Sequence, residues 1–151
     1  MSMVMGKSRR VTLNVLTLRW IPNDMDGGRE VEVLVDGVNL IELVRVWEAG
    51  HTPEPKLAGS YAGVQEWDAQ DLRDWLETLQ DWVPLLQCEC GVRGCWPLQT
   101  RVTREDGLVI WSDFKQPHRR GKWSYDGFGP FVFGAAQYEA EIGALLADVR
   151  G

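Results

Sequence analysis

Residues 100–114 read TRVTREDGLVIWSDF, and this stretch decides the fold class. Asp106-Gly107 is the preferred central pair of a type I′ turn, which joins two antiparallel strands tightly. Apolar residues flank the pair on both sides, with Val102 before it and residues 108–111 after it. The pattern therefore predicts a β-hairpin with strands at about 100–105 and 108–114.

A second hairpin is predicted nearer the N-terminus, with strands at about 11–21 and 29–36. The later strand alternates apolar and polar side chains, which is typical of a strand with one buried face. Residues 11–15 alternate in the same way, but the apolar residues that follow are out of phase with them: Leu16, Leu18 and Trp20. We interpret this slip as a bulge near residues 15–16 or as a strand buried on both faces.

A short helix is predicted at about 40–49. Asn39 is a suitable N-cap, and Glu42 stands three residues later, as in a capping box. Gly50 is placed to end the helix. The alternative for residues 38–46 is a strand, because β-branched side chains are frequent there.

Two further helices are predicted at about 69–80 and 135–149. The first has Asp68 as its N-cap, and both carry apolar residues at helical spacing. Residues 131–133 add a short strand. Hairpins mixed irregularly with helices predict an α+β fold with a mainly antiparallel sheet, and the length fits a single domain over residues 1–151.

The composition is that of an ordinary globular protein. Hydrophobic residues make up 44% and charged residues 25%, which argues against a disordered chain. No apolar run is long enough to span a bilayer, and residues 1–10 lack the apolar region of a secretory signal. Three cysteines are an odd number, which argues against a disulfide framework. We therefore expect a cytoplasmic protein without a membrane partner.

Charge is distributed unevenly along the chain, whose net charge is −6. Residues 61–92 contain seven acids and one base, whereas residues 93–123 contain seven bases and three acids. The two segments either neutralise each other or form separate surfaces. An acidic chain is not expected to bind nucleic acid through phosphate contacts, but its acidic part suits a basic protein partner. The carboxylates we name for that surface, at about 66–81, are Glu66, Asp71, Asp74 and Glu77.

All three cysteines lie in residues 88–95, which read CECGVRGC. Zinc at structural sites takes four nitrogen or sulfur ligands. Cys88, Cys90 and Cys95 with His118 are a candidate set, and His51 is the other histidine. The C-x-C-x4-C spacing departs from the usual zinc pattern. The alternatives are a redox pair, or reduced thiols packed as small apolar side chains at a glycine turn. We expect no cofactor, with zinc as the alternative.

A second suggestive stretch is residues 111–123, which mix basic residues, His118 and two tryptophans. Arg119 and Arg120 suit a phosphate or carboxylate, and a tryptophan can stack on a ring. The alternative is an exposed loop that pairs with the acidic segment. The motifs of common hydrolases, metalloproteases and nucleotide-binding enzymes are absent from the sequence.

Three strings are similar to small single-domain bacterial proteins of uncharacterised function: CECGVRGCWPL at 88–98, VIWSDFKQPHR at 109–119 and FGPFVFGAAQYEAEI at 128–142. The resemblance covers roughly the C-terminal half. It implies a cytoplasmic bacterial protein, and it implies no activity, substrate or site.

These observations favour a non-catalytic binding or interaction protein whose acidic surface meets a basic partner. The alternative function is a small metal-dependent module or enzyme centred on residues 88–95 and His118. A nucleophile–base pair of Cys95 and His118 requires a contact that sequence alone does not show.

Overall fold

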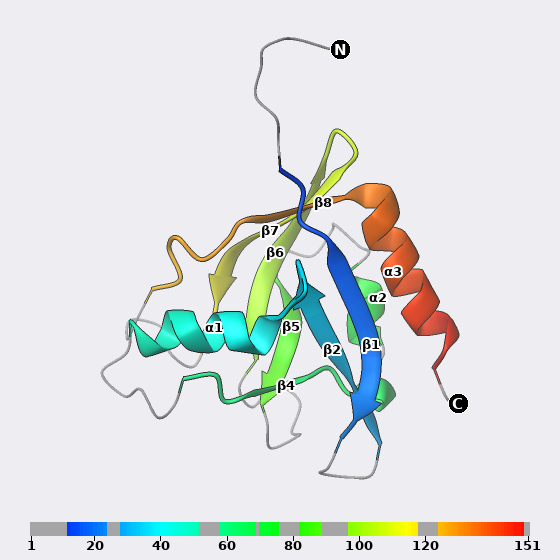
Figure 1. The fold of residues 1–151 in the computed structure, drawn as a ribbon, viewed down its shortest axis with the longest axis horizontal. Coiled ribbons are helices and arrows are strands. Elements are labelled where there is room, and N and C mark those ends of the chain that lie inside the picture. Colours follow the sequence, from blue (N-terminus) through cyan, green and yellow to red (C-terminus); the bar gives the residue numbers. More distant parts are fainter. Residues whose placement is uncertain are drawn as a thin grey trace.

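The computed structural model describes residues 12–23, 28–51, 58–68, 70–75, 82–88, 97–117 and 124–149 (Figure 1). They form two antiparallel sheets of three and five strands, together with three α-helices. The predicted α+β fold with mainly antiparallel sheet is therefore confirmed. In order, the elements are β1 (Leu16–Pro22), β2 (Arg29–Val35), β3 (Val38–Asn39), α1 (Leu40–Ala49), β4 (Tyr61–Gly63), η3 (Glu66–Asp68), α2 (Gln70–Asp74), β5 (Val83–Cys88), β6 (Leu98–Glu105), β7 (Leu108–Lys115), β8 (Phe131–Gly134) and α3 (Ala135–Ala147).

The N-terminal hairpin is present, but its first strand begins later than predicted. The expected strand at 11–21 is β1, which starts at Leu16. Leu13 and Val15 are exposed, and Asn14 makes an isolated parallel bridge to β8. The change of phase at residues 15–16 therefore marks the start of the paired strand.

Helix α1 occupies the predicted residues and begins at the predicted cap. The Asn39 side chain accepts a hydrogen bond from the Ile41 N–H at 2.7 Å. Glu42 forms an ion pair with Arg45 one turn later. Gly50 is the C-cap. The strand alternative for this segment is limited to β3, the two residues before the helix, which pair with β2.

The β6–β7 hairpin is confirmed together with its turn. Asp106 and Gly107 both have positive φ angles, of 51° and 76°, as a type I′ turn requires. The same dipeptide at Asp36-Gly37 has φ angles of 53° and 82° and joins β2 to β3. β8, at the predicted position, pairs with β7.

Strands β4 and β5 were not predicted. Residues 51–63 contain two prolines and two glycines, which disfavour a strand, yet the last three of them form β4. Pro84 disfavours a strand as well, yet it lies in β5. The β5–β6 register shifts between Pro84 and Leu86, where a residue without an N–H donor is tolerated.

The predicted helix at 69–80 is present in its first part as α2. Within it Leu72 is buried, and Trp75 directly after it is buried as well. Residues 76–81 lie outside the described part of the chain. The predicted helix at 135–149 is α3, which ends two residues early at Ala147.

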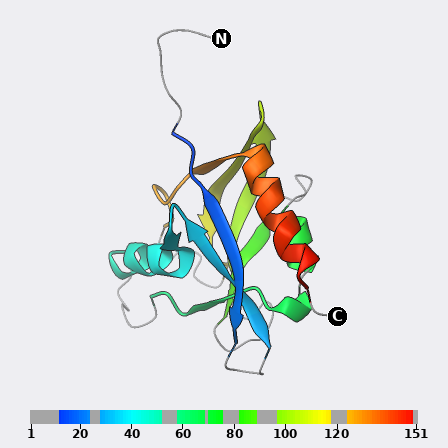
Figure 2. The ribbon, with the colours of Figure 1, turned by 45° about the vertical axis from the view of Figure 1, so that its right-hand side comes forward.

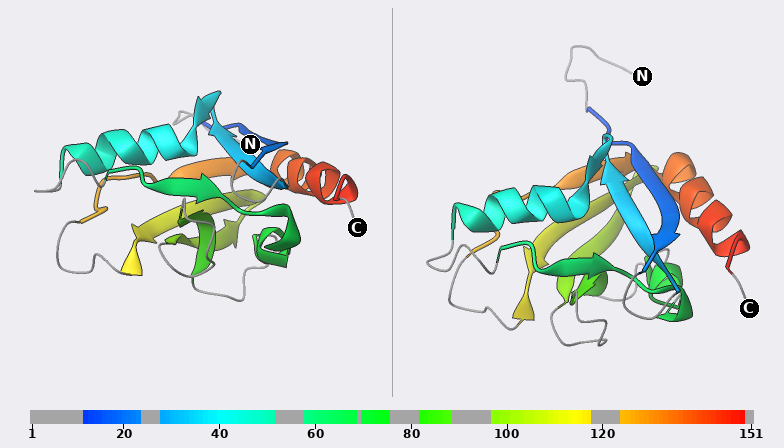
Figure 3. Two further views of the ribbon diagram at one scale, coloured as in Figure 1. Left: turned by 90° about the horizontal axis from the view of Figure 1, so that it is seen from below. Right: turned by 60° about the horizontal axis from the view of Figure 1, so that its bottom comes forward.

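The core lies between the two sheets, which are linked on both sides. Val31 N–H in β2 donates to the Val64 carbonyl after β4 at 2.9 Å, and Asn14 bridges β8 on the other side. Figure 3 shows the sheets as two layers, with α1 and α3 on opposite sides of the molecule. At the centre Trp111 is fully buried and donates to the Tyr138 hydroxyl of α3 at 3.1 Å. Among the described helices, none is long and apolar enough to cross a membrane.

Candidate functional site

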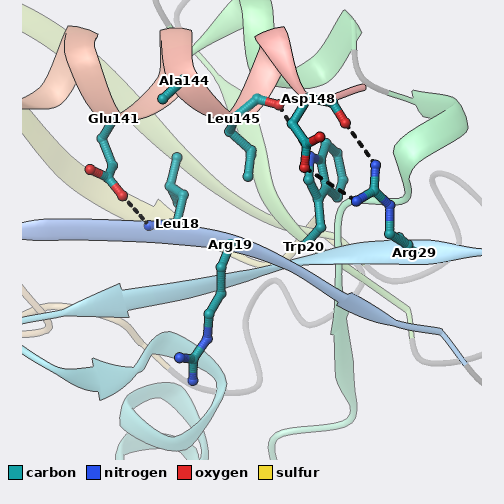
Figure 4. A pocket seen from close by; sticks show the side chains of 8 residues that line it. All are labelled: Leu18, Arg19, Trp20, Arg29, Glu141, Ala144, Leu145 and Asp148. Carbon is teal, nitrogen blue, oxygen red and sulfur yellow. Dashed lines mark hydrogen bonds and ion pairs between the residues drawn. The ribbon is translucent and has the colours of Figure 1, made fainter. Parts of the chain in front are cut away.

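A pocket of about 340 Å³ opens between β1 and the C-terminal half of α3 (Figure 4). Helix α3 runs beside β1, as Figure 2 also shows. The pocket is lined by side chains from β1, from the first residue of β2, from α3 and from the C-cap of α3: Leu18, Arg19, Trp20, Arg29, Glu141, Ala144, Leu145 and Asp148. It combines an apolar floor with charged groups at its rim, which is typical of a binding site.

Side chains of α3 cover the first part of β1's outer edge. Among the described strands, β1 pairs with β2 alone. On the other side, Gln137 accepts from the Leu16 N–H at 3.2 Å and donates to the Leu16 carbonyl at 2.6 Å. One turn later, Glu141 accepts from the Leu18 N–H at 2.9 Å. The two side chains thus replace a neighbouring strand, which protects an edge that would otherwise be open to pairing.

The next groups along the same edge open into the pocket. In an antiparallel pair, alternate residues turn their N–H and carbonyl away from the partner strand. Leu16, Leu18 and Trp20 are these residues, since α3 bonds to the first two. Among the described residues, no hydrogen bond reaches the Leu18 carbonyl or comes from the Trp20 N–H. This part of β1 is therefore a short open strand edge at the bottom of a pocket.

Trp20 holds the end of α3 against this open edge. Its indole Nε1 donates to the Leu145 carbonyl at 3.1 Å. The guanidinium of Arg29 lies over the ring, 5.2 Å from its centroid. The ring is thereby fixed between the helix and a cation, which makes one wall of the pocket rigid.

Arg29 ties the pocket to the acidic segment that the sequence singled out. Its Nε and one terminal nitrogen donate to the Glu66 carboxylate of η3 at 3.0 and 2.5 Å. It also donates to the Asp148 carbonyl at 2.7 Å and lies 3.3 Å from the Asp148 carboxylate. The bond to Glu66 is the main reason that the pKa of Arg29 is raised, so the guanidinium stays charged.

Two carboxylates and one guanidinium face the pocket beside α3. Arg29 is paired with Asp148 and with Glu66, which lies outside the pocket lining, whereas Glu141 lies at the other end of the pocket, beside Leu18 (Figure 4). Arg19 points away from α3 in Figure 4 and pairs with Glu32. The C-terminal end of α3 adds the negative end of its helix dipole.

The predicted partner-binding residues have different surroundings. Glu66 is largely taken up by Arg29, with its side chain only 12% exposed. Asp74 is half-buried and accepts from Gln70 at 3.3 Å. Asp71 lies in α2, and its side chain is outside the described part, as is Glu77. The use of these four carboxylates by a partner stays a prediction.

The predicted zinc ligands stay a prediction too. Cys88 is the last residue of β5, where it pairs with Tyr61. Cys90, Cys95 and His118 lie outside the described residues. Within the described ranges, no group of three histidine, cysteine or acidic side chains is arranged to hold a metal ion.

A second polar cluster lies on the α1 side and was not predicted. Glu48 is fully buried, and its Oε2 accepts from the hydroxyls of Tyr61 and Tyr125 at 2.6 and 2.5 Å. Its Oε1 accepts from the Gly59 N–H at 2.9 Å. Burial, followed by the neighbouring Tyr125 and Glu48, raises the pKa of Tyr61. The cluster joins α1 to β4 and to the segment before β8, and its carboxylate is satisfied internally.

No signal in the sequence indicates either polar site, because each combines residues that are far apart along the chain. Comparison with known proteins adds no further assignment: no family model, no curated protein and no solved structure matches this chain. The chemistry of the pocket is therefore inferred from its own residues.

Proposed function

We propose that this protein is a non-catalytic binding protein that takes an extended, basic peptide segment of a partner along the open edge of β1. The observation that carries the proposal is the incomplete cover of this edge by α3. The Leu18 N–H is bonded to Glu141, whereas the Leu18 carbonyl and the Trp20 N–H face a pocket. An added strand bonds to such groups through its own main chain.

Charge around the pocket favours a basic segment. Glu141 uses one carboxylate oxygen for the Leu18 N–H, and a carboxylate has further lone pairs for a second donor. The Asp148 side chain is 72% exposed. Two lysine or arginine side chains beside the bound backbone would meet one of these groups each, and complementary charge selects and speeds such encounters.

The space suits a short segment rather than a long strand. β1 ends at Pro22, which has no N–H to donate. Gln137 already occupies the edge at Leu16. An incoming peptide therefore pairs mainly with the Leu18 carbonyl and with Trp20, and side-chain contacts in the pocket supply the rest of the affinity.

A defined probe tests this proposal. The probe is a blocked peptide of alternating lysine and valine, and the matched control peptide has glutamate in place of lysine. Hydrogen exchange at the Trp20 amide reports strand addition directly, because an added strand bonds to that N–H. We expect the lysine peptide to slow this exchange and the glutamate peptide to leave it unchanged.

Two alanines on α3 provide matched variants. Ala144→Leu fills the pocket, whereas Ala136→Leu places the same side chain on an exposed part of the first turn. Protection of Trp20 by the lysine peptide should be lost in the first variant and kept in the second. Unchanged protection in Ala144→Leu, or no protection of Trp20 in the original protein, would contradict the proposal.

A further inference from the structure

The open edge of β1 presents its donors and acceptors in a particular order. The Leu18 N–H already donates to Glu141 at 2.9 Å. The Leu18 carbonyl and the Trp20 N–H come next, and neither has a partner among the described residues. The Trp20 carbonyl follows, and β1 then ends at Pro22, which has no N–H. A bound backbone must therefore supply a donor first and an acceptor second, and this order restricts its direction.

An antiparallel segment does not fit this order. In an antiparallel pair, two opposite residues exchange hydrogen bonds through both the N–H and the carbonyl of each. The peptide residue opposite Leu18 would therefore direct its own carbonyl at the Leu18 N–H. Because that N–H is already bonded to the Glu141 carboxylate, the peptide carbonyl would lack a donor and would face a negative charge. A polar group left unpaired in this way is costly.

A parallel segment fits the order when it begins beside Leu18. In a parallel pair, one residue donates to a carbonyl of the neighbouring strand and accepts from the N–H two positions later. A peptide residue opposite Arg19 therefore donates to the Leu18 carbonyl and accepts from the Trp20 N–H. Two positions earlier in the peptide, a further residue would again direct its carbonyl at the Leu18 N–H. The fit is therefore best for a chain that starts opposite Arg19.

Glu141 supplies the charge that suits the start of a chain. Its side chain is half-buried beside Leu18 (Figure 4), and the bond to Leu18 occupies Oε2. Among the described residues, no other hydrogen bond or ion pair reaches this carboxylate. Arg19 points away from α3 and pairs with Glu32 instead. Glu141 thus has lone pairs for a second donor and no cation of its own.

We propose that this end of the pocket binds the free amino terminus of a polypeptide, which then runs parallel to β1 toward Pro22. An ammonium has three N–H donors, so it can bond to the Leu18 carbonyl and to Glu141 at once. A lysine side chain could pair with Glu141 too, but it would not supply the main-chain donor for Leu18. Capture of a chain terminus is an established mode of peptide recognition. The inference rests on the proposed function, because it names the part of the partner chain that enters the pocket.

Two forms of one peptide test the inference. The peptide is Lys-Val-Lys-Val with a C-terminal amide, and its amino terminus is either free or acetylated. Acetylation removes the positive charge and two of the three donors from the terminal nitrogen. We expect the free peptide to bind about tenfold more tightly, the effect of one charge-assisted contact. Protection of the Trp20 amide against hydrogen exchange, measured over a range of peptide concentrations, gives both affinities.

A spin label at the C-terminal end of the free peptide reports its direction. In a parallel complex the label lies toward the end of β1, so it should broaden the NMR signals of Ile21 and Arg29 more than the signal of Leu16. An antiparallel complex would give the opposite order.

Glu141→Gln and Glu139→Gln are matched variants of α3. The first keeps an acceptor for the Leu18 N–H and removes the charge. The second removes the same charge from an exposed position, where Glu139 pairs with Arg104. The preference for the free over the acetylated peptide should be lost in Glu141→Gln and kept in Glu139→Gln.

The outcomes separate this inference from the proposed function. Equal affinity for the two peptides, with Trp20 protected by both, would overturn the inference and leave the proposed function in place. Broadening that is strongest at Leu16, or a preference that persists in Glu141→Gln, would overturn it as well. Absence of Trp20 protection with both peptides would contradict the proposed function itself.

Discussion

The two polar sites that join a helix to the sheets differ in how completely their groups are paired. On the α1 side, both oxygens of buried Glu48 accept hydrogen bonds from Tyr61, Tyr125 and Gly59. On the α3 side, Gln137 and Glu141 pair one part of the β1 edge, and the next groups open into a pocket. A fully paired buried network rigidifies a fold, whereas open main-chain groups in a pocket suit a ligand. We therefore associate the Glu48 network with stability, and the open groups of the β1 edge support our proposal of binding there.

The largest expected effect is loss of the closed network. Glu48→Ala leaves two buried hydroxyls and the Gly59 N–H without their acceptor. We expect it to lower the free energy of unfolding by about 3 kcal/mol, the cost of unpaired buried polar groups. Urea denaturation followed by circular dichroism measures this.

The matched control for that variant is Glu42→Ala, on the same helix. Glu42 is exposed and pairs with Arg45, and exposed ion pairs contribute little. Its stability should stay close to that of the original protein. If the two variants were equally stable, the closed network would have no special part in stability.

A smaller effect is expected where α3 covers β1. Gln137→Ala removes both bonds to Leu16, a residue that is only 1% exposed, and should cost about 2 kcal/mol in unfolding free energy. Gln137→Glu keeps the acceptor for the N–H and loses the donor, so its stability should be intermediate. Denaturant midpoints of the three proteins give the order.

The open part of the edge should tolerate a larger side chain. Ala144→Leu fills the pocket without removing a bond, so its unfolding free energy should change little. A loss as large as that of Gln137→Ala would show that the pocket region is packed as tightly as the covered edge, contrary to the structure.

The parts of the fold that could be predicted depend on neighbours in the sequence. Asp106-Gly107 specifies a turn within two residues, and Asn39 and Gly50 mark both ends of α1. The prolines and glycines of residues 51–63 favour a loop, so the sequence pattern does not indicate the short strand β4. That strand forms because long-range pairing with β5 overrides local propensity.

The candidate site is a product of tertiary structure and was missed for that reason. Trp20, Arg29 and Glu66 belong to three elements, and Asp148 follows the last helix. Arg29 and Asp148 are separated by 119 residues. The acidic segment was recognised from its charges, but the cation that engages Glu66 lies in β2, outside that segment. The acidic run in the sequence thus indicated a charged surface, but it did not indicate that Arg29 pairs with Glu66 within the fold.

A difference in pH dependence separates the two sites. Burial is the main cause of the raised pKa of Tyr61, and the neighbouring Tyr125 and Glu48 add to it. The native phenol therefore keeps its proton where a tyrosine in the unfolded chain, with a pKa of about 10, loses it. Between these two pKa values only the unfolded chain ionises, which lowers native stability. The contribution of Tyr61 to the free energy of unfolding is therefore complete below about pH 10 and decreases above it. The decrease is about 1.4 kcal/mol per pH unit for one group.

Denaturation at about pH 9 and 11 measures this decrease. The stability advantage of the original protein over Tyr61→Phe should be smaller at the higher pH. Its advantage over Trp20→Phe, at the open site, should stay constant because neither side chain titrates. Parallel changes in both variants would contradict this assignment.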